Sequence, residues 1–398
     1  MKVFLITKEP FPNGQAATNR IKAYAKACIR EGVDCEVLIY TRTEIYGRDP
    51  RNTQGHGIVD GISYRYLKGS PLRESNVIIR RWHDIMDFMR LKYYLSHNCN
   101  AGDVIFAYDK NFKINDIIQI AHNKNALLIQ ELCELPFGTS RETSKTIERR
   151  AKFEKKIMPK LDGMIAISDA LMEYAQKHCN ESCNIFKVPI LVDFPKYDMQ
   201  DRSAESPTPY IFHSGTLYEQ KDGFLSMLRA FGKVVSQLPF EVKFISTGKP
   251  DGTTHEQEIK DIIEEYGLEN RVIFTGYLSD EELKEYLSKA SFVIINKLTT
   301  QQNIYCFSTK LGEYMAASKA ILITNVGEAM NWLTHGKDAY IIPPNDIDKL
   351  ADAMKVMFEN PELRAKLGES AHETCRKSFS IEHNAPKFIS ALRNVKVH

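Results

Sequence analysis

The sequence contains no long hydrophobic run and carries almost no net charge. Among its 398 residues, apolar runs such as 292–295 fall far short of the roughly 18 residues that a membrane-spanning helix needs. Lysine and arginine number 53 against 51 for aspartate and glutamate, a formal net charge of +2, which gives no reason to expect nucleic acid as a partner. With 43% hydrophobic and 26% charged residues, the composition excludes a largely disordered or fibrous chain.

The sequence also predicts neither a leader segment nor a site of paired metal-binding cysteines. The N-terminal apolar run, residues 3–6, is interrupted by charged residues and a proline from position 8 onward, so it is too short for the core of a signal peptide. We therefore expect a cytoplasmic protein whose eight cysteines are reduced thiols. Cys179 and Cys183 form the closest pair, but they lack the CxxC spacing and no second pair follows, so we expect no metal site.

Strand and helix patterns alternate along the first half of the chain. Residues 2–7 form a short apolar run, 17–31 carry apolar residues at helical spacing and end at Gly32, and 35–40 form the next apolar run. This order is typical of a parallel sheet with crossover helices. Further strands are expected at 104–107, 126–130, 163–167 and 185–188.

The same plan starts again after a polar segment with two prolines, 201–209, which we interpret as a linker. Strands are expected at 210–213, 242–247, 272–275, 292–296, 320–324 and 340–342. The sequence therefore predicts an α/β protein with two Rossmann-like doubly wound domains, residues 1–200 and 201–380, followed by a last amphipathic helix. Because ligands bind at the carboxyl ends of parallel strands, we expect both domains to face one deep cleft.

The segment 307–324, FSTKLGEYMAASKAILIT, combines the residue types that bind a nucleotide. Ser308 or Thr309 stands where a helix begins, and the free amides at such an end attract phosphate. Lys310 adds a positive charge there, and Glu313, one turn further on the same face, could accept hydrogen bonds from a ribose diol. The alternative is a capping box, with Ser308 or Thr309 as the cap and Glu313 as a surface acid.

This segment resembles the donor-binding helix of the retaining glycosyltransferases of family 4, also called the group 1 glycosyltransferases. Many members read F-P-[ST]-K-x-x-E-Y-x-A-x-G-K-P, and the matching positions are Phe307, Thr309, Lys310, Glu313, Tyr314, Ala316 and Lys319. Segments at 166–193, 213–230 and 274–296 resemble other parts of the family in the same order. The resemblance implies a GT-B fold, with the acceptor in residues 1–200, the nucleotide-sugar donor in 201–380, and the helix at 381–398 returning to the first domain.

The resemblance also implies roles for individual residues. Lys221 corresponds to the lysine that grips the donor diphosphate, and Gly215 to a glycine that lets the backbone approach the donor; the alternatives are a loop lysine and a turn glycine. The other implied contacts are Gly14 at the phosphate or sugar, Gly276, Tyr277 and Leu278 at the base, Ser308, Thr309 and Lys310 at the diphosphate, and Glu313 at the ribose.

Three departures from the family's pattern bear on the implied function. Thr216, in the donor loop, stands where many members have an arginine, so diphosphate binding rests more heavily on Lys221 and Lys310. Tyr305 replaces a glutamate that contacts sugar hydroxyls, which leaves the identity of the sugar open. Glu134 lies in a segment where members often have a histidine near the donor sugar, so it is either a sugar contact or a loop acid.

The function implied is transfer of a hexose-type sugar, with retention and without a metal or cofactor, from a UDP- or GDP-linked donor to a saccharide or polyprenyl-linked acceptor, in surface glycan synthesis. Lys221 and Lys310 would stabilise the negative charge that develops on the leaving phosphate. The alternatives are a nucleotide-sugar epimerase or hydrolase, and a non-catalytic nucleotide-sugar binder. A dehydrogenase is disfavoured because no G-x-G-x-x-G follows either leading strand.

Two basic stretches with interleaved apolar residues, 73–97 and 141–160, lie in the first half. A basic amphipathic helix can rest on an anionic membrane, which would suit a lipid-linked acceptor and a peripheral location at the inner face. The alternative is a helix with its apolar side in the core and a solvated basic side.

Overall fold

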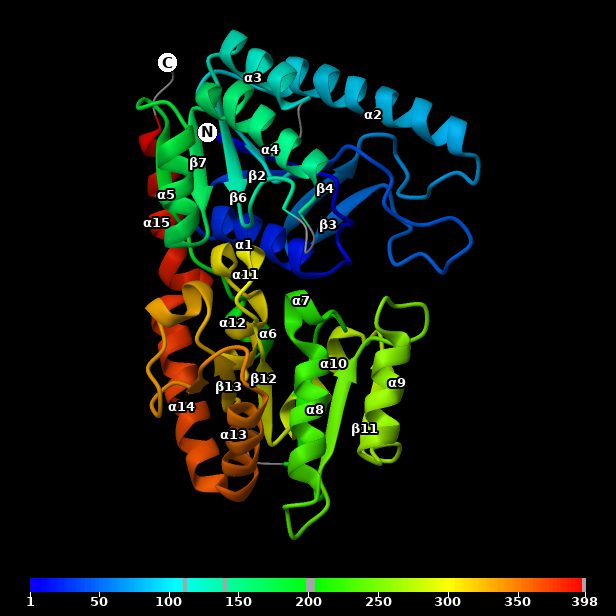
Figure 1. Ribbon diagram of the computed structural model, residues 1–398. Helices are drawn as coiled ribbons and strands as arrows, with labels where there is room; N and C mark the ends of the chain where they lie inside the picture. Colours follow the sequence, from blue (N-terminus) through cyan, green and yellow to red (C-terminus); the bar gives the residue numbers. More distant parts are fainter. Residues whose placement is uncertain (110–112, 139–141, 198–204, 396–398) are drawn as a thin grey trace. The chain divides into compact units, whose positions relative to one another are not determined.

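The chain folds into two compact units (Figure 1). The computed structural model describes residues 1–109, 113–138, 142–197 and 205–395. Unit 1 comprises Met1–Leu191 and Ile381–His398, and unit 2 comprises Val192–Ser380. The boundary therefore precedes the expected position at residue 200. Residues 201–204 of the expected linker lie outside the described residues.

Unit 1 contains an eight-stranded sheet with the order β3-β4-β2-β1-β5-β6-β7-β8. Its strands are β1 (Lys2–Thr7), β2 (Asp34–Ile39), β3 (His56–Val59), β4 (Ile62–Tyr66), β5 (Val104–Ala107), β6 (Leu127–Leu132), β7 (Gly163–Ala166) and β8 (Asn184–Lys187). All pairs are parallel except β3 with β4. The hairpin of β3 and β4 was not expected, because β3 is a short edge strand whose residues stay partly exposed and lack an apolar run.

The helices of unit 1 are α1 (Ala16–Arg30), α2 (Val77–Asn98), α3 (Ile114–Asn123), α4 (Ser144–Lys156), η1 (Met158–Lys160), α5 (Asp169–His178) and α15 (Ile381–Asn394). Gly32, just beyond α1, has a positive φ of 68°, which fits the expected helix stop. Helix α15 packs on α1, where the rings of Tyr24 and Phe388 lie 4.9 Å apart.

A buried ion pair fixes α1 on the sheet of unit 1. The guanidinium of Arg20 on α1 donates to the carboxylate of Glu131 on β6 over 2.7 Å, and the hydroxyl of Tyr24 donates to the other carboxylate oxygen over 2.7 Å. Both charged groups are buried, so each needs the other as a partner. The pair therefore belongs to the framework of the unit.

Unit 2 contains a six-stranded parallel sheet with the order β11-β10-β9-β12-β13-β14. Its strands are β9 (Tyr210–His213), β10 (Lys243–Thr247), β11 (Val272–Gly276), β12 (Phe292–Ile295), β13 (Ile321–Thr324) and β14 (Tyr340–Ile342). Numbered within the unit, this is the order 3-2-1-4-5-6 of dinucleotide-binding folds. The predicted α/β class with two Rossmann-like units is confirmed, and the cleft expected between them stays a prediction.

The helices of unit 2 are α6 (Phe194–Tyr197), α7 (Glu219–Asp222), α8 (Phe224–Val235), α9 (Glu256–Glu265), α10 (Asp280–Lys289), α11 (Gln301–Tyr305), α12 (Thr309–Ala316), η2 (Gly327–Asn331), α13 (Ile347–Glu359) and α14 (Pro361–Ser378). Phe224 and Phe231 of α8 and Phe292 of β12 are completely buried in the core. Burial of these large apolar groups fixes α8 on the sheet, and with it the loops at the carboxyl end of β9.

Candidate functional site

The chain order of unit 2 reverses between β9 and β12, and the candidate site lies where these strands end. In an open parallel sheet, the connections on either side of this switch point leave in opposite directions, which opens a crevice at the carboxyl ends. Here the segment after β9 runs through Gly215 into α7, and the segment after β12 begins with Asn296 and Lys297. Three charged groups meet at this end of the sheet.

Asp222, the last residue of α7, is the centre of this cluster. Its side chain is buried, and its carboxylate accepts four hydrogen bonds. One oxygen accepts from the ammonium groups of Lys297 (2.6 Å) and Lys310 (3.2 Å). The other accepts from the backbone amide (3.0 Å) and the hydroxyl (2.5 Å) of Thr216. Burial alone would raise the pKa of Asp222, but the charges of Lys310 and Lys297 hold it well below its ordinary value.

Lys297 was missed by the sequence analysis. It is a buried lysine two residues after the end of β12, and its ammonium donates to Asp222 and, over 2.9 Å, to the backbone carbonyl of Lys221. A lysine is seldom buried without a charged partner. Its position just after a buried strand at the switch point was the available signal, but its partner Asp222 is 75 residues away in sequence.

Lys310 lies at the N-terminus of α12, as expected. Ser308 is the N-cap residue, but in the described part of the chain its side chain forms no capping hydrogen bond, and the first turn contains no acidic residue. The capping-box alternative is therefore wrong. Burial lowers the pKa of Lys310, and the nearby charges of Lys297 and Lys221 act in the same direction, opposed by Asp222. An anion bound here would offset that burial, since it would supply further negative charge.

Gly215 lies against this cluster without any room for a side chain. A Cβ atom added there would lie 2.2 Å from the ammonium of Lys310 and 2.8 Å from Nε2 of His213. His213 ends β9, and its Nδ1 lies 3.0 Å from the hydroxyl of Ser246. Burial, with a smaller effect of Lys310, lowers the pKa of His213 to about 3, so the ring is neutral at physiological pH.

The remaining predicted donor contacts of unit 2 surround the cluster. Lys221 is exposed on α7, and its charge acts on Lys310. Glu313, half-buried one turn along α12, accepts a hydrogen bond from the hydroxyl of the buried Tyr197. Tyr305, at the end of α11, is half-buried. The structure thus brings Gly215, Thr216 and Lys310 together, and the roles of Lys221 and Glu313 toward a donor stay predictions.

Gly276, Tyr277 and Leu278 lie at the end of β11, two strands from β9. Gly276 has a φ of 76° and forms two backbone hydrogen bonds with Gly248, of 3.1 and 3.2 Å, which join the ends of β10 and β11. Leu217, in the loop after β9, lies against Gly248. The three residues are thus linked to the donor loop through Gly248, and their contact with a base stays a prediction.

Gly14 and Glu134 belong to unit 1. Gly14 lies in the loop between β1 and α1, where an added Cβ would lie 1.9 Å from the hydroxyl of Thr18, so close packing requires a glycine. Glu134 is exposed in the bend after β6. Their contacts with a donor stay predictions.

Across residues 1–109, 113–138, 142–197 and 205–395, no group of three or more His, Cys, Asp or Glu side chains is placed to hold a metal ion. In the same ranges, none of the helices combines the length and hydropathy that crossing a membrane requires.

Comparison with known proteins identifies relatives of unit 2 and of the whole fold. Residues 197–374 match the family described as Glycosyl transferases group 1. The lipopolysaccharide core biosynthesis glycosyltransferase LpsD of Rhizobium meliloti is 28% identical over 164 residues, which cover 41% of this chain and 43% of the relative. The chain spans between 27% and 64% of the length of such curated relatives.

Solved structures resemble the chain over nearly its full length. A sucrose-phosphate synthase from Thermosynechococcus elongatus has a TM-score of 0.76 at 16% identity, covering 98% of both chains. HepE of Anabaena, in complex with UDP-glucose, has a TM-score of 0.67 at 14% identity, covering 98% of this chain and 99% of HepE. At these identities the likeness shows the fold alone, which is the GT-B fold.

Proposed function

We propose, from the match of residues 197–374 to the group 1 glycosyl transferases, that the chain transfers a hexose-type sugar from a nucleoside diphosphate to an acceptor, with retention and without a metal. The single observation that carries this proposal is the cluster at the switch point of unit 2. Lys297 and Lys310 converge there on Asp222, beside the side-chain-free surface of Gly215 and the N-terminus of α12.

The cluster suits the charge that develops when a sugar–phosphate bond breaks. The leaving nucleoside diphosphate gains negative charge on its β-phosphate in the transition state. Preorganised cations and helix amides therefore stabilise the transition state more strongly than the ground state. Lys310 and the amides of α12 supply this environment, with Lys221 on the adjacent α7. Lys297 contributes a buried positive charge in the cluster where Thr216 replaces the family's arginine.

We propose that the acceptor hydroxyl attacks from the side of the leaving phosphate. The bond between the anomeric carbon and the phosphate oxygen breaks, the bond to the acceptor oxygen forms, and the acceptor proton passes to the phosphate. Asp222 is a poor candidate for a covalent nucleophile because its two oxygens already accept four hydrogen bonds. The sugar would therefore keep its anomeric configuration without an enzyme-bound intermediate.

We also propose that the acceptor is a saccharide carried on a lipid, in a surface glycan pathway, and that unit 1 associates with a membrane. The name of LpsD places that relative in lipopolysaccharide core synthesis. Helix α2 carries an exposed apolar stripe, spaced three or four residues apart: Ile78, Trp82, Ile85, Met89 and Tyr93. Ile78 is 79% exposed and Trp82 59%, and basic residues lie between them, as membrane-surface helices require.

The experiment that tests donor binding is thermal unfolding of the wild type and of Lys310→Ala, each with UDP, GDP and ADP and without metal. A ligand that binds only the folded state raises the melting temperature by mass action. We expect one nucleotide to stabilise the wild type and to stabilise Lys310→Ala much less. No stabilisation of the wild type by any of the three, or equal stabilisation of both proteins, would refute the donor site.

Membrane association has its own reporter, because the chain contains only two tryptophans. In a Trp332→Phe background the fluorescence comes from Trp82 alone. Anionic vesicles should shift its emission to shorter wavelength, neutral vesicles should not, and Ile78→Ser with Ile85→Ser should abolish the shift. An unchanged emission with anionic vesicles would contradict the association.

A further inference from the structure

A polar cavity in unit 1 lies outside the donor cluster. It has a volume of about 460 Å³, within the range of small-molecule sites. Lys8 follows β1, the segment 40–42 follows β2, and residues 73–88 come from the start of α2 and the loop before it. The cavity therefore opens at the carboxyl ends of parallel strands, where ligands of such sheets bind.

Positive charge dominates this cavity. Six lysines and arginines line it: Lys8, Arg42, Arg73, Arg80, Arg81 and Lys113. The carboxylic acids of the lining are only Glu74, Asp84 and Asp87 among the described residues. Glu74 already contacts Arg42 and accepts from Lys68 over 3.1 Å, and Asp87 accepts from Arg90 over 2.5 Å. Lys68 and Arg90, which engage these two acids, both lie outside the lining, so positive charge is left over in the cavity.

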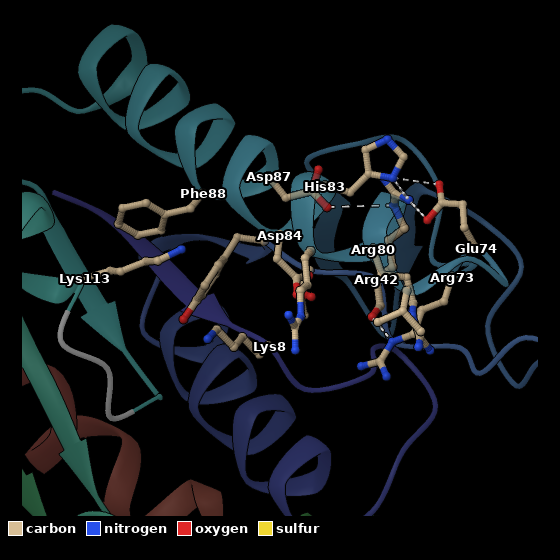
Figure 2. Close-up of a pocket in the computed structure, with 14 residues that line it drawn as sticks. Lys8, Arg42, Arg73, Glu74, Arg80, His83, Asp84, Asp87, Phe88 and Lys113 are labelled. Atoms are coloured by element: carbon tan, nitrogen blue, oxygen red, sulfur yellow. Dashed lines mark hydrogen bonds and ion pairs between the residues drawn. The ribbon is translucent and has the colours of Figure 1, made fainter. Parts of the chain in front are cut away.

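Arg42 is only 4% exposed, and its hydrogen-bond donors are incompletely paired. Figure 2 shows its guanidinium between Glu74, His83 and Asp87. One terminal nitrogen contacts Glu74 and lies 2.7 Å from Nδ1 of His83. Nε lies 3.8 Å from the carboxylate of Asp87, too far for a hydrogen bond. In the described part of the chain, Nε and the second terminal nitrogen have no hydrogen-bond partner.

Buried guanidinium donors without an acceptor are costly, and the excess positive charge of the lining would attract an anion into the cavity. Arginine forks match the oxygens of phosphate groups, and several arginines around one polar cavity are typical of phosphate recognition. Arg73, which donates to the carbonyl of Arg42 over 2.7 Å, and the partly exposed Arg80 and exposed Arg81 add further donors around the opening.

We propose that this cavity binds the phosphate or diphosphate group of the acceptor substrate. The inference rests on the proposed glycosyl transfer, because it takes unit 1 as the acceptor unit, and it specifies the acceptor as a phosphate-bearing molecule. Val77, Arg80 and Arg81 line the cavity on the same helix that carries the exposed apolar stripe. A phosphate held there can belong to a lipid headgroup or to a soluble sugar phosphate, and the experiment separates the two sources.

The test is calorimetric titration of the full chain with farnesyl diphosphate, inorganic pyrophosphate and farnesol. Four proteins are compared: wild type, Arg80→Gln/Arg81→Gln, Lys310→Ala, and Lys145→Gln/Lys177→Gln. The last removes two exposed positive charges from α4 and α5 of the same unit, outside the cavity. We expect wild type, Lys310→Ala and the control pair to bind farnesyl diphosphate equally, and Arg80→Gln/Arg81→Gln to bind about tenfold or more weakly, because two charge-assisted contacts are lost.

Binding of pyrophosphate as tight as that of farnesyl diphosphate supports a soluble phosphate acceptor, and clearly tighter binding of farnesyl diphosphate supports a lipid-borne one. Three results overturn the inference: unchanged binding by Arg80→Gln/Arg81→Gln, equal binding of farnesol, or no binding by the wild type. Loss of binding in Lys310→Ala alone also overturns it, since the diphosphate then occupies the donor cluster. That last result would leave the proposed donor site intact. The donor site is tested independently by the stabilisation of the protein with nucleotides.

Arg42→Gln removes the buried guanidinium itself and should weaken farnesyl diphosphate binding at least as much. Because that substitution leaves Glu74 without one of its cations, its folding is checked by circular dichroism. The exposed pair Arg80→Gln/Arg81→Gln keeps the test decisive if Arg42→Gln does not fold.

Discussion

Substitution of Asp222 by asparagine should destabilise the unliganded protein and increase its response to nucleotide. The carboxylate is the shared partner of the Lys297 and Lys310 ammonium groups, and both of its oxygens are in use. An amide at this position removes the negative charge and turns an NH₂ group toward either the lysines or the two donors of Thr216. Breaking a buried ion pair from one side costs about 3–5 kcal/mol.

For a unit of this size, 1 kcal/mol changes the melting temperature by about 2–4 °C, so we expect a decrease of about 6–20 °C in Asp222→Asn. The diphosphate of the bound nucleotide would supply the missing negative charge. The rise in melting temperature with the nucleotide that stabilises the wild type should therefore be larger in the variant. Scanning fluorimetry and circular dichroism, each with and without nucleotide, measure both effects.

The matched control is Asp348→Asn in the same unit. Asp348 is 80% exposed and pairs with Lys233 over 2.5 Å, and exposed pairs contribute at most about 1 kcal/mol. A melting temperature of Asp222→Asn equal to that of Asp348→Asn would show that the buried lysines do not depend on this carboxylate. A smaller nucleotide response in Asp222→Asn than in the wild type would refute the proposed place of the diphosphate.

Two further predictions concern residues of the same cluster. Burial lowers the pKa of His213 to about 3, whereas an unfolded histidine titrates near its ordinary value of about 6.5. Between pH 3 and 6.5 the unfolded state therefore binds a proton that the native state does not bind. The wild type should lose stability as the pH falls from 6.5 toward 3, and His213→Gln should lose less. Urea titrations at pH 7 and 4.5 measure the free energy of unfolding of both proteins. Equal losses of unfolding free energy in the two proteins would contradict this prediction. Gly215→Ala should lower the melting temperature, because the buried ring of His213 must move as well as the flexible end of Lys310, and it should weaken nucleotide binding about tenfold by displacing that ammonium. Nucleotide affinity equal to that of the wild type would disprove the close approach at Gly215.

Local sequence determined most elements of the fold because their signals are short-range. Buried parallel strands such as β1 and β12 read as continuous apolar runs, and helices such as α1 end at a glycine with positive φ. Within the candidate site, the residues that the resemblance matched, Thr309, Lys310 and Glu313, lie on one helix, and their placement there needed no tertiary information. The edge strand β3 lacked such a signal, since one partner strand and solvent surround it.

What only the tertiary structure decided are the partnerships between distant residues. Asp222 and Lys297 are 75 residues apart and read separately as a loop acid and a lysine after a strand; only the adjacency of β9 and β12 makes them a buried ion pair. The apolar positions of α2 are equally ambiguous, because periodicity does not say which side of a helix meets the core. Phe88, Leu91 and Leu95 do so, while Ile78, Trp82 and Ile85 face solvent. Sequence specifies which side chains are present. Their burial and pairing depend on which surfaces the sheet order brings together. That order decides which partner a buried lysine has and whether a tryptophan is exposed.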